Sequence, residues 1–316
     1  MKGKVLIALG LLIIWALVWV SSDWIEERIP PSEEPSKSSQ KEQEHPKPVP
    51  VEISRDGKDV HVKLTAQQQR IQIAKGVEYP AWTFNGTVPG PVLKVREGDR
   101  LHLQLKNMDS KMNHSVDIHA VNAAPDKHFA DVQPGKTDEF EYEVEDPGVY
   151  MYHCATTPMM EHVANGMYGM IIVEPKEGYP TDQAVDRTFT LTQSEWYKGR
   201  DMEEDRPKYV AFNGVAHKYD AARPLKAKAG ERIRIYFVNA GPNEMSSLHV
   251  VGTTLDRVYV DGDPRNSLNG VQTVTVSPGG GTVVEFEVDE PGEYTIISHQ
   301  LNQFSKGAKA ILKVTR

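Results

Sequence analysis

The sequence predicts an all-β protein in which two similar β-sandwich domains follow one another. From about residue 51 onward, apolar and polar residues alternate in short segments, as at Leu101, Leu103 and Leu105, and Gly-Asp, Pro-Gly and Asn-Gly pairs separate these segments. No long amphipathic helix is evident. A set of motifs also recurs once, at a spacing of about 130 to 144 residues. The length of 316 residues agrees with two domains, each able to bury its own core.

Four motifs carry the internal repeat. Phe84-Asn85-Gly86, Pro91-Val92-Leu93-Lys94 and Gly98-Asp99-Arg100 recur as Phe212-Asn213-Gly214, Pro224-Leu225-Lys226 and Gly230-Glu231-Arg232. Further on, Asp146-Pro147-Gly148-Val149-Tyr150 is matched by Glu290-Pro291-Gly292-Glu293-Tyr294. One repeat of this period favours two β-sandwiches over a short-period solenoid. We therefore divide this part of the chain into residues 51–177 and 178–316.

The first 22 residues have the pattern of a membrane segment. Lys2 and Lys4 precede an apolar run from Val5 to Val20, which as a helix would reach roughly 24 Å. Because lysines favour the inner side, we expect residues 1–22 to anchor an exported protein at the outer face of the cell membrane. A cleaved signal segment is the alternative. Residues 23–50 are rich in Glu, Lys, Ser, Gln and Pro, which predicts a flexible linker.

Charge restricts the partners of the protein. The formal net charge of -8 and the pI near 5.8 argue against nucleic acid, whose binding needs a basic face. An anionic substrate would need local positive charge, such as a metal ion supplies.

Cys154 is the single cysteine of the chain, so it cannot form an intrachain disulfide. Zinc sites that use two or more cysteines are excluded for the same reason. The nearby His153, His162 and Met167 add two imidazoles and a thioether to the sulfur of Cys154. A thiolate with imidazoles and a weak thioether ligand is the donor set of a blue-copper electron-transfer site. The sequence therefore predicts a copper site at Cys154.

The adjacency of His153 and Cys154 predicts a second metal site. Consecutive side chains on a strand point to opposite faces of the sheet, so His153 faces away from a metal held by Cys154. His114 and His119 are an odd number of residues apart and also face opposite ways on an extended segment. One of them can join Cys154 and the other His153, while Asp117 shares the face of His119. Two metal sites linked through one peptide unit are expected.

Alignment of the two repeats shows what the second copy lacks. It has Ser246 opposite His114, Ser298 opposite Cys154 and, approximately, Ala308 opposite Met167. The second domain therefore cannot build a thiolate site. It keeps two other histidines, with His249 opposite Asp117 and His299 one place after the equivalent of Cys154. We expect these two histidines to serve another metal or the reaction itself.

Taken in order over about residues 60–316, these motifs resemble those of copper-containing nitrite reductases. The matching motifs are His114, Asp117, His119, His153-Cys154, His162, Gly166-Met167 and His299. The resemblance implies two cupredoxin-type Greek-key β-sandwich domains and a homotrimer. It also implies dissimilatory reduction of nitrite to nitric oxide, as in denitrification, with an external electron donor such as a c-type cytochrome or a small cupredoxin.

The resemblance also implies the roles of the site residues. A type 1 copper would take His114, Cys154, His162 and Met167. A type 2 copper would take His119 and His153 from one subunit and His299 from a neighbour. Asp117 and His249 would be the catalytic pair that handles protons, and the electron would pass from the type 1 to the type 2 copper.

Two features differ from the best-known branch of that family. The loop from Ala155 to Glu161 is shorter and carries Pro158-Met159-Met160, which resembles the Gram-positive branch. The catalytic histidine of the best-known branch comes a few residues later on its strand, where this chain has Thr253 and Thr254. His249 is chosen here because it falls opposite Asp117 in the repeat.

Two other functions share part of this pattern. A two-domain multicopper oxidase needs His-x-His pairs and a His-Cys-His motif, and the sequence has neither. A single-site electron carrier would leave His119, His153 and His299 without a role. Other histidines are expected to be surface or hydrogen-bonded residues: His45, His61, His102, His128 and His217. Met159, Met160 and Met170 are expected to pack or to line a donor surface.

Overall fold

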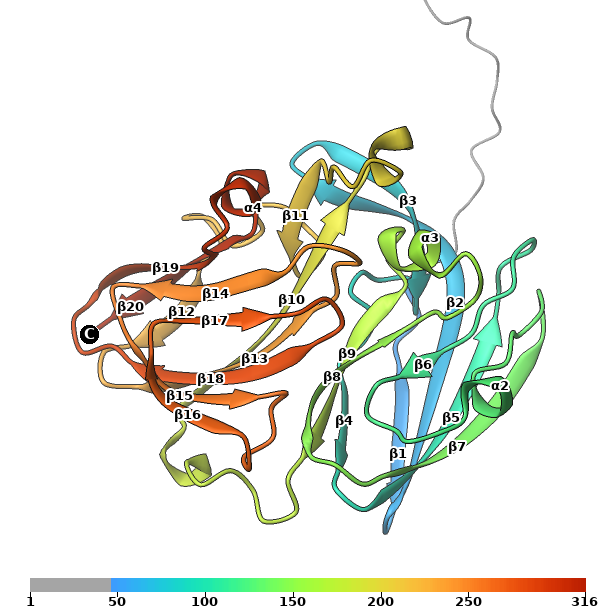
Figure 1. The fold of residues 1–316 in the computed structure, drawn as a ribbon, viewed down its shortest axis with the longest axis horizontal. Helices are drawn as coiled ribbons and strands as arrows, with labels where there is room; N and C mark the ends of the chain where they lie inside the picture. Colours follow the sequence, from blue (N-terminus) through green and yellow to red (C-terminus); the bar gives the residue numbers. More distant parts are fainter. Residues whose placement is uncertain (1–46) are drawn as a thin grey trace, which may run out of the picture. The chain divides into compact units, whose positions relative to one another are not determined.

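The first repeat folds as two facing β-sheets in the computed structural model, which describes residues 47–316 (Figure 1). Its strands are β1 (Glu52–Asp56), β2 (Asp59–Ala74), β3 (Val77–Phe84), β4 (Leu93–Arg96), β5 (Asp99–Asn107), β6 (Asp117–Ile118), β7 (Thr137–Val144), β8 (Gly148–His153) and β9 (Tyr168–Glu174). One sheet has the order β1-β2-β5-β7, with β3 paired to β2, and the other has the order β4-β9-β8-β6. Two short helices, α2 (Pro125–His128) and α3 (Met159–Ala164), lie in the connections.

The alternation seen in the sequence sets which face of each strand is buried. On β5, Leu101, Leu103 and Leu105 are buried, whereas the side chains between them face outward or are half-buried. Leu101 and Leu103 join Tyr152 and Ile171 of the opposite sheet in one apolar core. Burial of these side chains is the main stabilising contribution to the sandwich.

The second repeat forms a second sandwich of two sheets. Its elements are η1 (Asp182–Ala184), β10 (Arg187–Trp196), η2 (Gly199–Met202), β11 (Tyr209–Phe212), β12 (Leu225–Lys228), β13 (Arg232–Asn239), β14 (Ser246–Val251), β15 (Leu255–Val260), β16 (Ser267–Val271), β17 (Thr273–Val276), β18 (Gly281–Glu287), β19 (Gly292–Ser298), α4 (Leu301–Lys306) and β20 (Lys309–Thr315). One sheet has the order β11-β10-β13-β18-β15-β16 and the other β12-β20-β19-β14-β17. Apolar residues of both sheets form a separate core.

Strand β8 lies where the two sandwiches meet, beside β13 and β18 (Figure 1). Val149 and Met151 on one face of β8 pack with Val238 and Val283 of the second domain. The opposite face of β8 carries Tyr152 into the core of the first domain. Because β8 is buried on both faces, successive side chains along it point alternately into the first and the second domain.

One expectation about local structure needs correction, and another lies outside the described residues. We expected a loop from Ala155 to Glu161, but α3 begins at Met159, so His162 lies on a helix. The anchor predicted at residues 1–22 and most of the linker at 23–50 precede the described part of the chain. Among residues 47–316, no helix combines the length and apolarity required for a membrane span.

Candidate metal centres

The two neighbours His153 and Cys154 face different environments at the end of β8. Cys154 continues the face of Tyr152 and is fully buried in the core of the first domain. His153 continues the face of Met151, which packs against the second domain. The structure therefore separates the two side chains as the period of the strand predicts.

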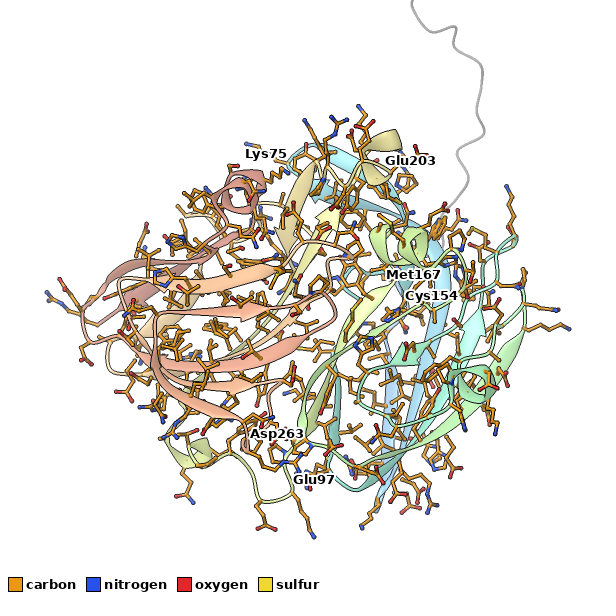
Figure 2. All side chains as sticks on the ribbon, viewed as in Figure 1. Lys75, Glu97, Cys154, Met167, Glu203 and Asp263 are labelled. Atoms are coloured by element: carbon orange, nitrogen blue, oxygen red, sulfur yellow. The ribbon has the colours of Figure 1, made fainter. Side chains whose placement is uncertain are left out.

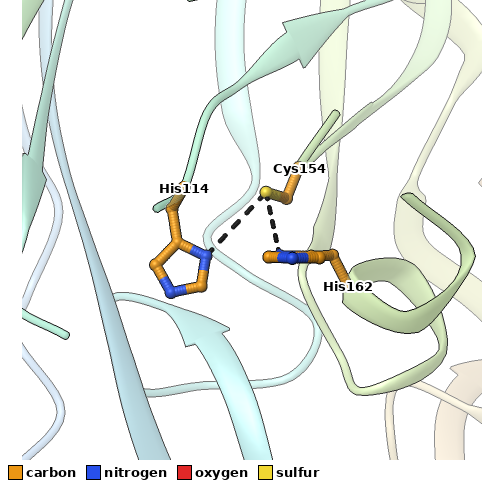
Figure 3. Close-up of side chains that lie close together, drawn as sticks. All are labelled: His114, Cys154 and His162. Carbon is orange, nitrogen blue, oxygen red and sulfur yellow. Dashed lines mark hydrogen bonds between the residues drawn. The ribbon is translucent and has the colours of Figure 1, made fainter. Parts of the chain in front are cut away.

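Cys154 lies in a cluster with His114 and His162 (Figure 3). The Cys154 Sγ is 3.3 Å from Nδ1 of His162 and 3.9 Å from Nδ1 of His114. All three residues are buried. One sulfur and two imidazole nitrogens thus converge in a space closed to bulk water.

The backbone around Met167 ties this cluster together. The amide of Cys154 donates to the Met167 carbonyl at 3.0 Å, and the Met167 amide donates to the His162 carbonyl at 3.1 Å. Met167 is fully buried in the same apolar core as Cys154, and Figure 2 shows the two side by side. The residue predicted to supply the thioether therefore lies next to Cys154 in the fold. His114 is held from the other side, because its backbone pairs with that of Val132.

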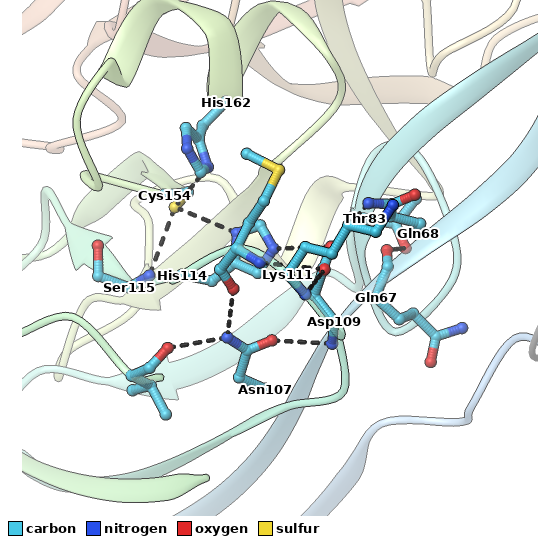
Figure 4. A network of polar contacts seen from close by, with 12 residues as sticks. Gln67, Gln68, Thr83, Asn107, Asp109, Lys111, His114, Ser115, Cys154 and His162 are labelled. Carbon is cyan, nitrogen blue, oxygen red and sulfur yellow. Dashed lines mark hydrogen bonds and ion pairs between the residues drawn. The ribbon is translucent and has the colours of Figure 1, made fainter. Parts of the chain in front are cut away.

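Asp109 orients His114 from behind (Figure 4). Its Oδ2 lies 3.4 Å from Nε2 of His114, and the carboxylate also accepts bonds from the Lys111 amide at 2.8 Å and the Gln68 side chain at 2.9 Å. A carboxylate beside Nε2 favours the tautomer protonated there, which leaves the Nδ1 lone pair directed at Cys154. No motif or spacing in the sequence indicates Asp109.

Burial sets the protonation of this cluster. It lowers the pKa of His114 and lowers the pKa of His162 to about 4, so both imidazoles are neutral near neutral pH. Burial also raises the pKa of the Cys154 thiol. Metal binding requires neutral imidazoles and a thiolate, so a metal that enters here must displace the thiol proton.

The second cluster consists of His119, His153 and Asp117. Nε2 of His119 lies 3.0 Å from Nε2 of His153, and Oδ2 of Asp117 lies 3.7 Å from the same His153 atom. Register explains the arrangement, because Asp117 of β6 is paired directly with His153 of β8. His119 is exposed, Asp117 is half-buried and His153 is buried, so this cluster opens to the surface.

Hydrogen bonds at the other ring nitrogens show that this cluster fits a metal ion. Nδ1 of His153 lies 3.0 Å from the Cys154 carbonyl oxygen, and Nδ1 of His119 lies 3.1 Å from the Gly279 carbonyl oxygen. A carbonyl only accepts, so each Nδ1 carries the proton and each Nε2 presents a lone pair. Two lone pairs 3.0 Å apart repel one another unless a cation lies between them. Burial lowers the pKa of His153, which keeps that ring neutral and able to ligate.

Gly279 brings the second domain into contact with His119. It has φ of +77°, and a Cβ added there would lie 3.1 Å from Cε1 of His119. The turn therefore needs a residue that tolerates the left-handed region and leaves room for the imidazole ring. Nothing in the sequence pattern indicated Gly279, because 160 residues separate it from His119.

The two histidines of the second domain form a pair of their own. The rings of His249 and His299 have centroids 5.4 Å apart in an edge arrangement, and Nδ1 of His249 donates to the Gln272 carbonyl at 2.6 Å. Within the chain, neither belongs to the cluster of His119, His153 and Asp117. The structure thus brings together two of the three predicted type 2 ligands and leaves the third with His249.

Comparison with known proteins adds the family. Two family models, both described as multicopper oxidase, match residues 65–178 and 186–315, which confirms the predicted tandem of cupredoxin-type domains. The copper-containing nitrite reductase of Neisseria gonorrhoeae is 42% identical over 287 residues, which cover 85% of this chain and 72% of the relative.

Solved structures give the same result. A copper nitrite reductase from Nitrosomonas europaea is 39% identical with a TM-score of 0.78, over 82% of this chain and 94% of that chain. A copper-containing nitrite reductase from Thermus scotoductus SA-01 is 38% identical with a TM-score of 0.77, over 81% of this chain and 61% of that chain. The chain belongs to the copper-containing nitrite reductase family.

Proposed function

We propose that this protein reduces nitrite to nitric oxide with one type 1 and one type 2 copper per chain. The observation that carries the proposal is the separation of two peptide-linked residues. Cys154 lies with His114 and His162, and His153 lies with His119. A simple electron carrier needs only the first cluster, whereas a reductase needs a second centre where substrate binds.

The reaction converts nitrite, one electron and two protons into nitric oxide and water. Bound copper would supply one-electron redox chemistry at the first cluster and a Lewis-acidic position for nitrite at the second. His114, Cys154, His162 and Met167 would hold the type 1 ion. The peptide unit between Cys154 and His153 provides a continuous covalent path for the electron between the two clusters.

The first cluster is suited to electron transfer rather than to substrate binding. Its ring nitrogens and sulfur are buried, and Trp82 packs edge-on against the His162 ring with centroids 4.8 Å apart. Nitrite in water has no open route to such a centre. Exposed His119 gives the second cluster the access that a substrate needs.

Asp117 is placed to handle a proton at the second cluster. Its carboxylate lies 3.7 Å from Nε2 of His153, on the side where the Nε2 lone pairs of His119 and His153 converge. A carboxyl within reach of bound nitrite can deliver a proton to the departing oxygen, and general acids typically contribute about 10² to 10⁴ in rate. His249 would act with Asp117, and its proton on Nδ1 is held by the Gln272 carbonyl, which leaves Nε2 for the substrate side.

A homotrimer would complete the type 2 site, with His299 and His249 coming from a neighbouring subunit. Support comes from the two half-sites of one chain. His119 and His299 are both exposed, and His119 lies with His153 and Asp117, whereas His299 lies beside His249. Self-association in which one surface of a subunit meets a different surface of the next closes into a ring when the rotation between subunits closes, and the sequence resemblance implies a ring of three.

We also propose an exported protein held at the outer face of the cell membrane by residues 1–22. The apolar run after Lys2 and Lys4 supports this location. The electron donor would be a c-type cytochrome or a small cupredoxin. Met159 supports donor docking near the first cluster, because it is 47% exposed on the same short helix that carries His162.

The test is a nitrite-dependent assay for nitric oxide with an artificial electron donor, combined with copper analysis. We expect two coppers per chain with distinct paramagnetic signatures and nitric oxide formed only when nitrite is present. One copper per chain, with only the thiolate type of signal, would contradict the reductase function and support a simple electron carrier. Oxygen consumption without nitrite turnover would favour a multicopper oxidase.

A further inference from the structure

In the second domain, the position equivalent to the type 1 centre is filled by a buried polar network. The Ser247 amide donates to Ser298 Oγ at 3.3 Å, as the Ser115 amide donates to Cys154 Sγ at 3.4 Å. The Ser298 amide donates to the Ala308 carbonyl at 3.1 Å. The same bond joins Cys154 to Met167 at 3.0 Å in the first domain. Ser298 therefore occupies the place of the copper-binding cysteine.

Gln303 occupies the place of His162. It lies on α4, which follows Ser298 as α3 follows Cys154. Ser298 Oγ donates to Gln303 Oε1 at 2.6 Å, the counterpart of the 3.3 Å contact between Cys154 Sγ and His162. Gln303 is completely buried, so its amide depends on protein partners for all of its hydrogen bonds.

Those partners are present on both atoms of the Gln303 amide. Oε1 also accepts from the Gln193 side chain at 3.1 Å. The two hydrogens of Nε2 are shared among Glu244 Oε2 at 2.8 Å, the Met245 carbonyl at 2.9 Å and Gln300 Oε1 at 3.2 Å. One side chain thus joins β10, the segment before β14, and the end of β19.

The network surrounds His299 through the residues on either side of it. Ser298 and Gln300 both bond to Gln303, and Gln300 Nε2 also donates to the Met245 carbonyl at 2.7 Å. The His299 amide itself donates to the Ser247 carbonyl at 2.7 Å. The imidazole of His299 is exposed. The bonds to the His299 amide and to the neighbouring side chains therefore set the position of the His299 backbone, from which the ring extends.

We propose that Gln303 is a positioning residue for the type 2 copper, because its amide holds the side chains of Ser298 and Gln300, the residues on either side of His299. The inference rests on the proposed role of His299 as a copper ligand. A ligand must be held within about 0.5 Å of its productive place by residues that support it. Loss of such a supporting partner typically weakens metal binding by about 10- to 100-fold.

The first experiment replaces the amide with an apolar side chain of similar length, Gln303→Met. In metal-free protein, we expect faster hydrogen exchange at the His299 amide than in wild type. In copper-loaded protein, we expect a chelator to remove the type 2 copper at about 10- to 100-fold lower concentration. The visible thiolate band should be unchanged. The matched control is Gln67→Met, because Gln67 is equally buried but lies in the first domain.

A second pair of variants tests the bond to Glu244 and does not depend on the first variant folding. Gln303→Glu places two carboxyls against each other, and we expect it to reproduce the loss. Adding Glu244→Gln exchanges amide and carboxyl across the 2.8 Å bond, and we expect it to recover most of the type 2 affinity. Equal affinities in the single and double variants would contradict the proposed role of this bond.

The outcomes separate this inference from the proposed function. A wild-type protein without type 2 copper would remove the function, whereas the exchange of the His299 amide would still report on Gln303. A Gln303→Met protein of lower thermal stability, but with wild-type exchange at His299 and wild-type type 2 affinity, would overturn the inference. Gln303 would then stabilise the fold without positioning the ligand.

Discussion

Glu195 is a buried carboxyl whose ionisation should make the free energy of unfolding depend on pH. Its oxygens accept bonds from the Tyr197 hydroxyl and from the Glu244 amide. Burial raises the pKa of Glu195 from its ordinary value of 4.5 to about 7. Since a tenfold change in acidity corresponds to about 1.4 kcal/mol, this rise corresponds to about 3 kcal/mol. Between these two pH values the folded protein keeps a proton that the unfolded chain has lost. Stability therefore falls as the pH rises through that window.

The assay compares metal-free wild type with Glu195→Gln by urea unfolding from about pH 4.5 to pH 8. We expect wild type to lose about 3 kcal/mol relative to the variant over this range. Glutamine can keep both contacts. Its Oε1 can accept from the Glu244 amide, and its Nε2 can donate to the Tyr197 hydroxyl, which then donates to Asp205 Oδ1 at 3.0 Å. Both proteins contain the same buried histidines, so the contribution of histidine titration cancels in the difference between their free energies of unfolding. Parallel profiles for the two proteins would refute the reasoning.

Three further predictions concern the copper centres. Gly279→Ala should weaken type 2 copper binding by about 10- to 100-fold in chelator competition, because a methyl group would press on His119. Gly135→Ala is the control, since it also has positive φ but no atom within 4 Å of an added Cβ; equal effects would point to backbone strain alone. Asp117→Asn should slow nitrite turnover by about 10² to 10⁴ with both coppers retained, and unchanged turnover at every pH would clear Asp117 of a catalytic role. Mixing a His299→Ala chain with a His119→Ala chain should restore part of the activity, and no rescue in verified mixed oligomers would count against a site shared between subunits.

The local sequence pattern was sufficient to predict the parts of the fold that depend on strand periodicity. The alternation of Leu101, Leu103 and Leu105 identified a buried face, and the fold bears this out. The alignment of the two repeats placed Ser298 opposite Cys154. Equivalent bonds support that alignment, because a backbone amide donates to Cys154 Sγ in the first domain and to Ser298 Oγ in the second. These features follow from residues close in sequence or from a repeat that the chain itself displays.

The missed features depend on contacts between distant segments. Asp109 lies in a connection whose path the strand pattern does not define, so its contact with His114 had no sequence signal. Gly279 meets His119 only because the two sandwiches pack together at β8. The helix α3 has no side-chain cap at its first residue, so nothing in the sequence marked its beginning. The equivalence of Gln303 with His162 follows only from the structural correspondence of α4 with α3.

The central claim is that residues 153 and 154 serve different coppers, and paired variants test it most directly. Copper content and paramagnetic spectra would be measured for Cys154→Ala and His153→Ala beside wild type. We predict that Cys154→Ala loses the visible thiolate band and keeps the other copper, while His153→Ala keeps the band and loses the second signal. Loss of the same centre in both variants would contradict the account.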